Sequence, residues 1–217
     1  MKKALLAGAS GLVGRSCLDE LLKDDYYSDV EIWIRKSLNI TIPKLTEKII
    51  DFSEIGNMPK TEAEHIFCCL GTTIRIAKTK EAFRKVDYDY VIELGKLAER
   101  SGCEKFLVVS SLGANKDSGN FYMRTKGEME DSLRKFSIPS LSIFRPAMLF
   151  GKRKEFRLGE VFIKPIMQIL GIFLFGKLKK YKGIYASTVA KAMLIAAKQE
   201  FMGIRIIKSD KIQELVN

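Results

Sequence analysis

Apolar runs and helical repeats alternate along most of this chain. The first apolar run, residues 4–7, is followed over residues 12–22 by apolar positions with helical spacing. Further apolar runs predict strands over residues 30–34, 48–52, 65–69, 105–109 and 140–144. Amphipathic repeats predict helices over residues 80–100, 121–136 and 187–198, and a late strand is expected over residues 203–207. This alternation predicts an α/β fold, a Rossmann-like doubly wound parallel sheet with helices on both faces.

The pattern changes after Gly151. Residues 152–157 are basic and polar, and residues 161–176 are mostly apolar but interrupted by Lys164, Pro165, Gln168 and Gly171. A membrane-spanning helix needs about 20 apolar residues, so we expect a buried helix or a substrate lid instead. We treat residues 1–217 as one domain and residues 151–200 as its small substrate-binding or lid appendage. Lysines at 177, 179, 180 and 182 keep peripheral membrane contact open as the less favoured alternative.

The composition narrows the possible partners. The chain has 217 residues, 47% of them hydrophobic, and a formal net charge of +11. A cationic surface favours anionic ligands such as phosphates, nucleic acid or an acidic membrane. No nucleic-acid-binding motif accompanies the charge, so we expect a basic, solvated surface and no nucleic-acid partner. We expect a small-molecule substrate, and a monomer or homodimer.

Cysteine usage predicts reduced thiols and no metal site. Cys17, Cys68, Cys69 and Cys103 form no C-x-x-C pair, and no histidine stands at a zinc-ligand spacing from them. Cys68 and Cys69 are adjacent on a predicted strand and should point to opposite faces. The first strand starts directly at the N-terminus, which argues against a signal peptide, so we expect a cytoplasmic protein. His65, the only histidine, is expected at the surface.

Three glycines follow the first predicted strand at intervals of three. Gly8 permits a tight turn out of the strand, Gly11 lets the backbone approach a pyrophosphate, and Gly14 lets the next helix pack close to the strand. The free N–H groups of the first helical turn would then face the negative charge of the ligand. A glycine triplet alone also fits a flexible loop, but the strand before it and the helix after it favour a nucleotide site. The cofactor contacts expected here are Gly8, Ser10, Gly11, Leu12, Val13, Gly14 and Arg15.

Cations near the end of the second strand favour NADP over NAD. This strand ends at Arg35-Lys36, the position that meets the adenosine ribose in a dinucleotide fold. An acid there hydrogen-bonds the 2′-hydroxyl of NAD, whereas arginine accommodates the 2′-phosphate of NADP. Together with Arg15 beside the glycine turn, these residues place three cations where the 2′-phosphate would sit, which favours NADP. The alternative is that Arg35 and Lys36 simply end a strand in solvent. Further cofactor contacts are expected at the ends of the next two strands, at Asp51, Phe52, Leu70, Gly71 and Thr72. For Asp51 and Phe52, an ordinary turn at a strand end is a serious alternative.

Tyr122 and Lys126 stand four residues apart on a predicted helix and therefore share one face. A cation beside a phenol favours the phenolate, so Lys126 would lower the pKa of Tyr122. A tyrosine tuned in this way can give or take a proton at a carbonyl or hydroxyl while hydride moves. Taken alone, the pair is better explained by an amphipathic helix with a half-buried ring and a solvated lysine. The glycine turn and the serine pair in register with it favour the site instead.

The motifs together resemble those of a known superfamily. In chain order they are the glycine triplet, Leu70-Gly71-Thr72, Ser110-Ser111, Tyr122-x-x-x-Lys126 and Arg145-Pro146. The set resembles the extended or atypical branch of the short-chain dehydrogenase/reductase superfamily. The stretch over residues 120–130 is similar to small NAD(P)-binding oxidoreductases of the Tat-interacting-protein type, and the likeness covers nearly the whole chain.

The resemblance implies roles for individual residues. It assigns Ser111 to hydrogen-bond the reacting oxygen, with Ser110 as the alternative, and Tyr122 and Lys126 as the other catalytic residues. Lys126 would also hold the nicotinamide ribose, and Pro146 and Met148 would border the nicotinamide. The resemblance implies an NADP-dependent oxidoreductase acting on a small, rather apolar carbonyl or alcohol. Because the region after residue 151 is short, a bulky nucleotide sugar is a poor candidate.

An alternative function stays open. Atypical members of this superfamily include proteins that bind the cofactor for stability or sensing. The chain would then be a non-catalytic NADP(H)-binding regulatory or assembly protein acting through protein partners. The basic residues 152–157 or 177–182 would supply its partner surface.

Overall fold

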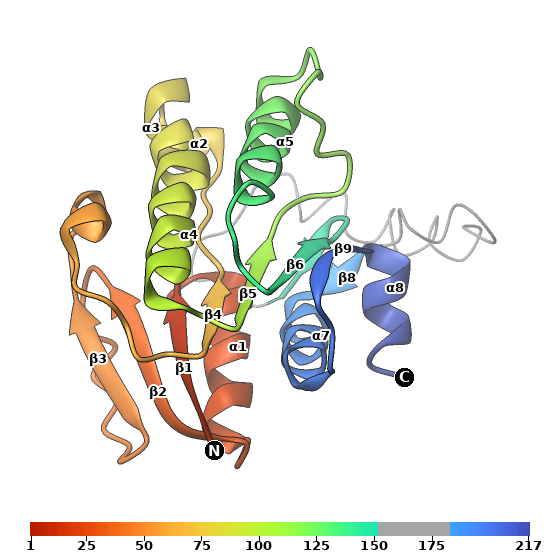
Figure 1. Ribbon diagram of the computed structural model, residues 1–217. Coiled ribbons are helices and arrows are strands. Elements are labelled where there is room, and N and C mark those ends of the chain that lie inside the picture. The colour runs from red at the N-terminus through yellow and green to blue at the C-terminus, as the bar shows by residue number, and fades with distance from the viewer. Residues whose placement is uncertain (152–182) are drawn as a thin grey trace.

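In the computed structural model, which describes residues 1–151 and 183–217, one parallel sheet organises the protein (Figure 1). The strands of this sheet in the described residues are β1 (Lys2–Ala7), β2 (Tyr27–Ile34), β3 (Leu45–Ile49), β4 (His65–Cys68), β5 (Lys105–Val109), β6 (Ser140–Arg145) and β9 (Gly203–Lys208). Their order is β3-β2-β1-β4-β5-β6-β9, and each neighbouring pair is parallel. The order reverses between β1 and β4, which is where ligands bind in open sheets of this kind.

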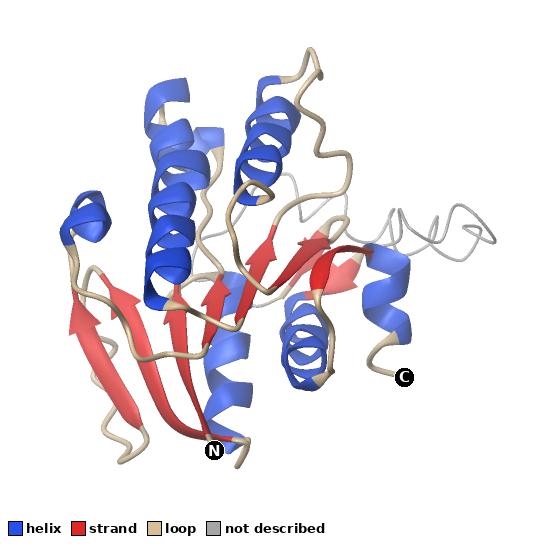
Figure 2. Cartoon of the chain, viewed as in Figure 1, coloured by secondary structure: helices blue, strands red, loops and turns tan. Residues whose placement is uncertain are grey.

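Helices cover both faces of the sheet (Figure 2). On one face, α1 (Leu12–Lys23) packs against α7 (Ala186–Lys198) over a shared apolar core. The other face carries α4 (Tyr90–Ser101) and α5 (Phe121–Leu133) over a second core. This confirms the predicted doubly wound architecture.

Alternation along the buried strands divides their side chains between the two cores. In β1, Ala4 and Leu6 lie in the core beneath α1, whereas Leu5 and Ala7 lie in the core beneath α4. Cys68 and Cys69 divide in the same way, as predicted from their adjacent positions.

The predicted third strand is displaced along the chain. It was expected over residues 48–52, but β3 ends at Ile49, where it pairs with Ile34 of β2. The chain then turns at Asp51, whose carboxylate accepts a hydrogen bond from the Ser53 N–H at 2.9 Å and caps the 3₁₀ turn η1 (Phe52–Asn57). The end of β3 could not be predicted from apolar residues. Ile50 and Phe52 continue the apolar run and pack against the core, but they lie beyond the end of the strand.

The predicted helix over residues 80–100 is divided into three parts. A short helix α3 (Lys80–Arg84) leads into a π-helical turn η2 (Lys85–Asp89), and α4 follows. A π-helical turn inserts one extra residue into a helix and changes the direction of its side chains. Asp87 belongs to this turn, and its side chain is buried in the interior.

Part of the predicted C-terminal appendage lies in the core instead. Strand β7 (Leu149–Phe150) pairs with β8 (Ile184–Tyr185), and α7 follows directly. Residues 186–198 therefore form a core helix beside α1 rather than a lid, because one face of that helix is almost continuously apolar. Residues 152–182, where the basic segment, the apolar run and the lysine cluster were predicted, lie outside the described residues. No helix among the described ranges is long and apolar enough to cross a bilayer.

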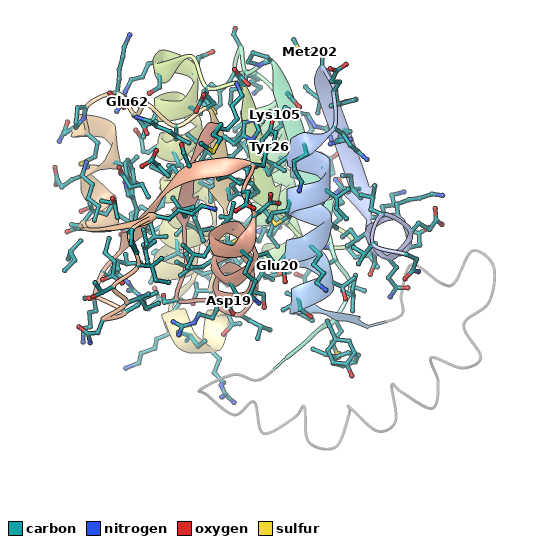
Figure 3. The ribbon with its side chains drawn as sticks, turned by 90° about the horizontal axis from the view of Figure 1, so that it is seen from below. Asp19, Glu20, Tyr26, Glu62, Lys105 and Met202 are labelled. Carbon is teal, nitrogen blue, oxygen red and sulfur yellow. The ribbon has the colours of Figure 1, made fainter. Side chains whose placement is uncertain are left out.

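His65 is buried rather than exposed, so the surface prediction is wrong. It begins β4 at the amino end of the sheet, which Figure 3 views from below, and is 0% exposed. The Tyr27 hydroxyl lies 3.0 Å from its Nδ1 atom, and the Tyr26 ring stacks on it at 5.9 Å between centroids. Burial lowers the pKa of His65 to about 4. The side chains that cover His65 come from the start of a different strand, and the hydrophobic periodicity of β4 itself gives no information about such contacts.

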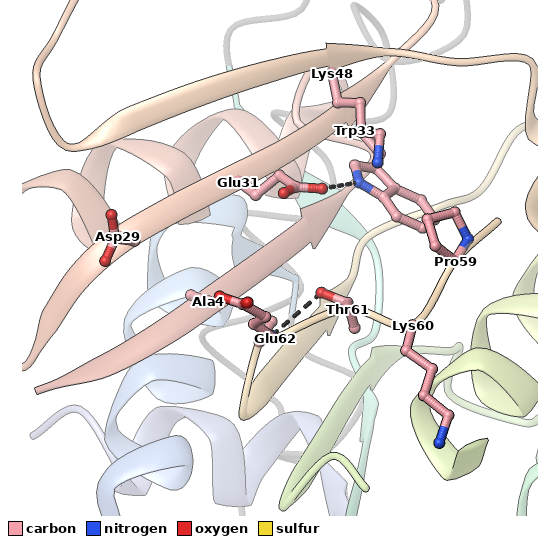
Figure 4. A pocket seen from close by; sticks show the side chains of 10 residues that line it. Ala4, Asp29, Glu31, Trp33, Lys48, Pro59, Lys60, Thr61 and Glu62 are labelled. Carbon is pink, nitrogen blue, oxygen red and sulfur yellow. Dashed lines mark hydrogen bonds between the residues drawn. The ribbon is translucent and has the colours of Figure 1, made fainter. Parts of the chain in front are cut away.

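A pocket opens beside Trp33, lined by residues of β1, β2 and β3 and of the segment before β4 (Figure 4). The Trp33 indole donates a hydrogen bond to Glu31 there, and Lys48 lies over the Trp33 ring at 5.6 Å from its centroid. The pocket holds none of the predicted site residues.

Candidate functional site

The glycine turn after β1 requires glycine at two of its three positions. Gly8 has φ +90°, and an added Cβ would lie 2.6 Å from the carbonyl oxygen of Cys69. At Gly14 an added Cβ would lie 2.0 Å from the Gly8 carbonyl oxygen. The first glycine makes the turn and the third brings α1 against it, as the sequence predicts. Gly11 is exposed, and its Cβ position would lie 3.3 Å from that same Gly8 oxygen.

The N-terminus of α1 has no side-chain cap. Gly11 is the N-cap residue, and the first turn carries no acidic side chain. The N-termini of α2 (Ile74–Ala77), α3 and α5 are capped by Thr73, Thr79 and Asn120, whereas α7 lacks a side-chain cap as α1 does. Unpaired N–H groups at the positive end of a helix dipole form a site for an anion such as a phosphate.

The remaining residues of the turn divide into exposed and buried positions. Ser10 and Arg15 are exposed, and Leu12 is half-buried. Val13 is only 6% exposed and lies in the core. A ligand at this turn would therefore meet the Val13 backbone and not its side chain.

Two cations stand free after β2. Arg35 and Lys36 are exposed, and neither forms an ion pair with a residue that the structure describes. Asp51 is also exposed, but Phe52 is 5% exposed and its ring packs against Tyr90 at 5.8 Å between centroids. Burial leaves Phe52 as a core residue, so its ring offers no free face to an adenine.

The loop after β4 approaches α5. Leu70 is buried, Gly71 is exposed, and the Thr72 N–H donates to Asp87 Oδ2 at 2.8 Å. An added Cβ at Gly71 would lie 3.4 Å from Asp87 Oδ1 and 3.8 Å from Lys126 Nζ. This loop therefore lies against the lysine that the sequence assigns to catalysis.

Tyr122 and Lys126 both lie on α5, but the lysine has a partner that the sequence analysis missed. Lys126 is 4% exposed, and its Nζ lies 2.8 Å from Asp87 Oδ1. Burial lowers the pKa of Lys126, but attraction to the Asp87 carboxylate and then to Tyr122 outweighs it, so the pKa is raised. The half-buried Tyr122 ring packs against Phe83 at 5.5 Å between centroids.

A signal for Asp87 was present in the sequence. It stands four residues after Phe83 and four before Val91, and both of these are fully buried. A carboxylate on the apolar face of a helix needs a buried partner. That spacing alone does not identify which cation supplies it.

A second buried ion pair holds α5 to the sheet. Glu130 is 1% exposed, and its carboxylate accepts from Arg145 Nη2 at 2.5 Å and Nε at 2.9 Å. Ser110 donates to the same carboxylate at 2.5 Å. Of the two candidate serines, Ser110 is thus engaged in this network. The hydroxyl of half-buried Ser111 donates, among the described residues, only to the backbone oxygen of Leu112 at 3.4 Å. Glu130 is not among the site residues predicted from the sequence.

The last predicted contacts follow β6. Pro146 is buried and its carbonyl accepts from the Leu112 N–H at 2.9 Å, whereas Met148 is 36% exposed. These residues, the glycine turn, the Thr72 loop and Ser111 all follow the carboxyl ends of strands, and α5 rises above the same edge (Figure 1). The predicted catalytic and cofactor residues therefore gather at one edge, across the point where the strand order reverses.

The chain is similar in sequence to an animal protein and to fungal proteins. No family model matches the chain. It is 35% identical to the rat (Rattus norvegicus) protein HTATIP2 over 164 residues, covering 73% of this chain and 67% of that protein. It is also 30% identical over 228 residues to the Candida glabrata protein FMP52, covering 99% and 95% of the two chains. The chain belongs to the HTATIP2/FMP52 family. The resemblance to Tat-interacting-protein-type members of the short-chain dehydrogenase/reductase superfamily is thereby confirmed.

Solved structures agree with the fold of this HTATIP2/FMP52 family member. MoeE5 in complex with UDP-glucuronic acid and NAD superposes with a TM-score of 0.70 at 17% identity, covering 94% of this chain and 75% of that one. The UDP-glucose 4-epimerase of Thermotoga maritima gives 0.68 at 17% identity, covering 95% and 76%. At these identities the likeness establishes the Rossmann-like fold.

The family relationship corrects one prediction. FMP52 of Candida glabrata and of Candida albicans are both named as mitochondrial proteins. The cytoplasmic localisation predicted from the cysteines and the first strand conflicts with those names, and it is withdrawn. Reduced cysteines do not distinguish the cytoplasm from other reducing compartments.

Proposed function

We propose that this protein binds a nicotinamide dinucleotide, with NADP preferred over NAD. The uncapped N-terminus of α1 behind Gly11 carries the proposal, because it presents free N–H groups without a competing carboxylate. Exposed Arg35, Lys36 and Arg15 support the preference for the additional phosphate of NADP. Membership in the HTATIP2/FMP52 family and the fold of NAD-bound structural neighbours support the same ligand class.

The proposed activity is oxidoreduction of a carbonyl or alcohol on a small, rather apolar substrate. The bound dinucleotide would supply or accept the hydride. Tyr122 would give a proton to the substrate oxygen or take one from it, and Ser111 would hydrogen-bond that oxygen. Lys126 would donate hydrogen bonds to the nicotinamide ribose and favour the Tyr122 phenolate.

Calorimetric titration with NADPH and NADH in parallel tests the binding site. We expect tight NADPH and weak NADH binding in the wild type, with Arg35→Asp levelling or reversing the difference. Lys60→Asp makes the same charge change at an exposed position in the pocket beside Trp33, and it should leave both affinities unchanged. Binding of neither nucleotide by the wild type would refute the proposal, and equal loss in both variants would refute the assignment of Arg35.

One observation supports the non-catalytic alternative. The Asp87 carboxylate pairs with Lys126 at 2.8 Å, and an ammonium whose charge is balanced by a carboxylate favours the Tyr122 phenolate less strongly than an unpaired one. Under this alternative, the protein would bind NADP(H) and act through protein partners. Steady-state NADPH oxidation with small carbonyl compounds separates the two functions, because only the oxidoreductase turns over.

A further inference from the structure

Asp87 joins three segments of the chain at the candidate site. It lies in the π-helical turn η2 and is 1% exposed. One carboxylate oxygen accepts from the Thr72 N–H at 2.8 Å, in the loop after β4. The other lies 2.8 Å from Lys126 Nζ on α5. Both oxygens of a single buried carboxylate are therefore used to hold neighbouring segments.

Within residues 1–151 and 183–217, few charged groups act on Lys126. Desolvation opposes an ammonium at a position that is 4% exposed. Besides Asp87, the titratable groups among the described residues that act on Lys126 are Tyr122 from α5 and Cys68 from β4. Burial raises the pKa of the Cys68 thiol to about 12, so this thiol is neutral at working pH. Asp87 is then the anion that balances the buried ammonium.

We propose that Asp87 is a positioning residue that keeps Lys126 charged and ties it to the Gly71-Thr72 loop. The lysine and the loop would then meet a ligand as one preorganised unit. A neutral hydrogen-bond acceptor would fit the same space, but only a carboxylate offsets the cost of burying an ammonium. The assignment rests on the proposed function only for the identity of the ligand that Lys126 meets.

Titration of Lys126 without any nucleotide tests the electrostatic part. Protein labelled with ¹³C at lysine Cε reports the pKa values by NMR, and Lys126→Met identifies the resonance. Asp87→Asn removes the charge but keeps an acceptor, and it should lower the pKa of Lys126 by about one unit or more. Asp89→Asn, at an exposed position of the same turn, should leave that pKa unchanged. A Lys126 pKa that is the same in wild type and Asp87→Asn would overturn the proposal, whatever the stability of the variant.

Nucleotide binding tests the positioning part. Loss of a charge-assisted hydrogen-bond network should weaken NADPH binding by about tenfold in Asp87→Asn, with Asp89→Asn unaffected. NADPH affinity equal to wild type in Asp87→Asn would overturn the positioning role. Failure of the wild type itself to bind NADPH would refute the proposed function, and the Lys126 titration would still decide the inference.

A double variant covers the case in which Asp87→Asn does not fold. Asp87→Asn combined with Lys126→Met removes both charges and leaves no unpaired ion inside the protein. We expect the double variant to fold even where Asp87→Asn does not, and, where both fold, to unfold at a higher urea concentration than Asp87→Asn. A double variant that also fails to fold would overturn the pairing. A double variant that is as unstable as the sum of the two single changes would overturn the pairing.

Discussion

Replacing Gly14 by alanine tests how closely α1 is packed against the glycine turn. The new Cβ would lie 2.0 Å from the carbonyl oxygen of Gly8 and 2.7 Å from its carbonyl carbon, whereas ordinary contacts begin at 3.4 Å. Both obstacles are backbone atoms, so α1 has to move away from the strand by more than 1 Å. Overpacking of this kind costs about 2–3 kcal/mol, which lowers the Tm of a chain this long by about 4–12 °C.

Thermal unfolding of three alanine variants separates the roles of the glycines. Gly119→Ala is the control, because nothing lies within 4 Å of its added Cβ. Gly11→Ala should also melt close to wild type, since its nearest atom is 3.3 Å away and its φ of −77° suits alanine. That methyl group would nevertheless stand where a phosphate approaches, so NADPH binding should be lost. A Gly14→Ala variant that melts with the control, or a Gly11→Ala variant that binds NADPH normally, would refute this account of the turn.

Three further measurements address other parts of the molecule. Arg145→Gln leaves the Glu130 carboxylate buried without its cation and should lower the free energy of unfolding by about 3 kcal/mol in urea titrations; a loss below about 1 kcal/mol would contradict a buried pair. The folded-state pKa of His65 is about 4, below its ordinary 6.5, so the unfolded chain binds more protons between these values. Stability should therefore fall by about 3 kcal/mol as the pH drops from 6.5 to 4, and His65→Gln should flatten this slope. Tyr122→Phe should keep NADPH affinity and lose most turnover, and unchanged turnover would remove this hydroxyl from the mechanism.

Local sequence patterns were sufficient to predict the elements around the glycine turn. The strand ending at Ala7, the glycine spacing and the apolar face of α1 are all encoded within neighbouring residues. The division of Cys68 and Cys69 between the two cores also follows from strand geometry alone. These features need no knowledge of distant contacts, and the structure has them where they were predicted.

The buried polar partners depend on contacts between distant segments. Glu130 meets Ser110 and Arg145 only after α5 docks on β5 and β6, and their separations of 20 and 15 residues fit no helical or strand period. The π-helical turn is similar, since the apolar repeat continues through residues 80–100 while the backbone departs from it. His65 was wrongly predicted at the surface for the same reason. The side chains that bury it are Tyr27, the first residue of β2, and Tyr26, the residue before that strand.

The pairing of β7 with β8 joins two points that are far apart along the chain. Leu149 pairs with Ile184 and Phe150 with Tyr185, so the described residues on either side of positions 152–182 lie next to each other. The entropy cost of closing a stretch of chain rises only slowly with its length. The β7–β8 pair therefore fixes the start of α7 at an entropy cost that depends little on how many residues separate the two strands.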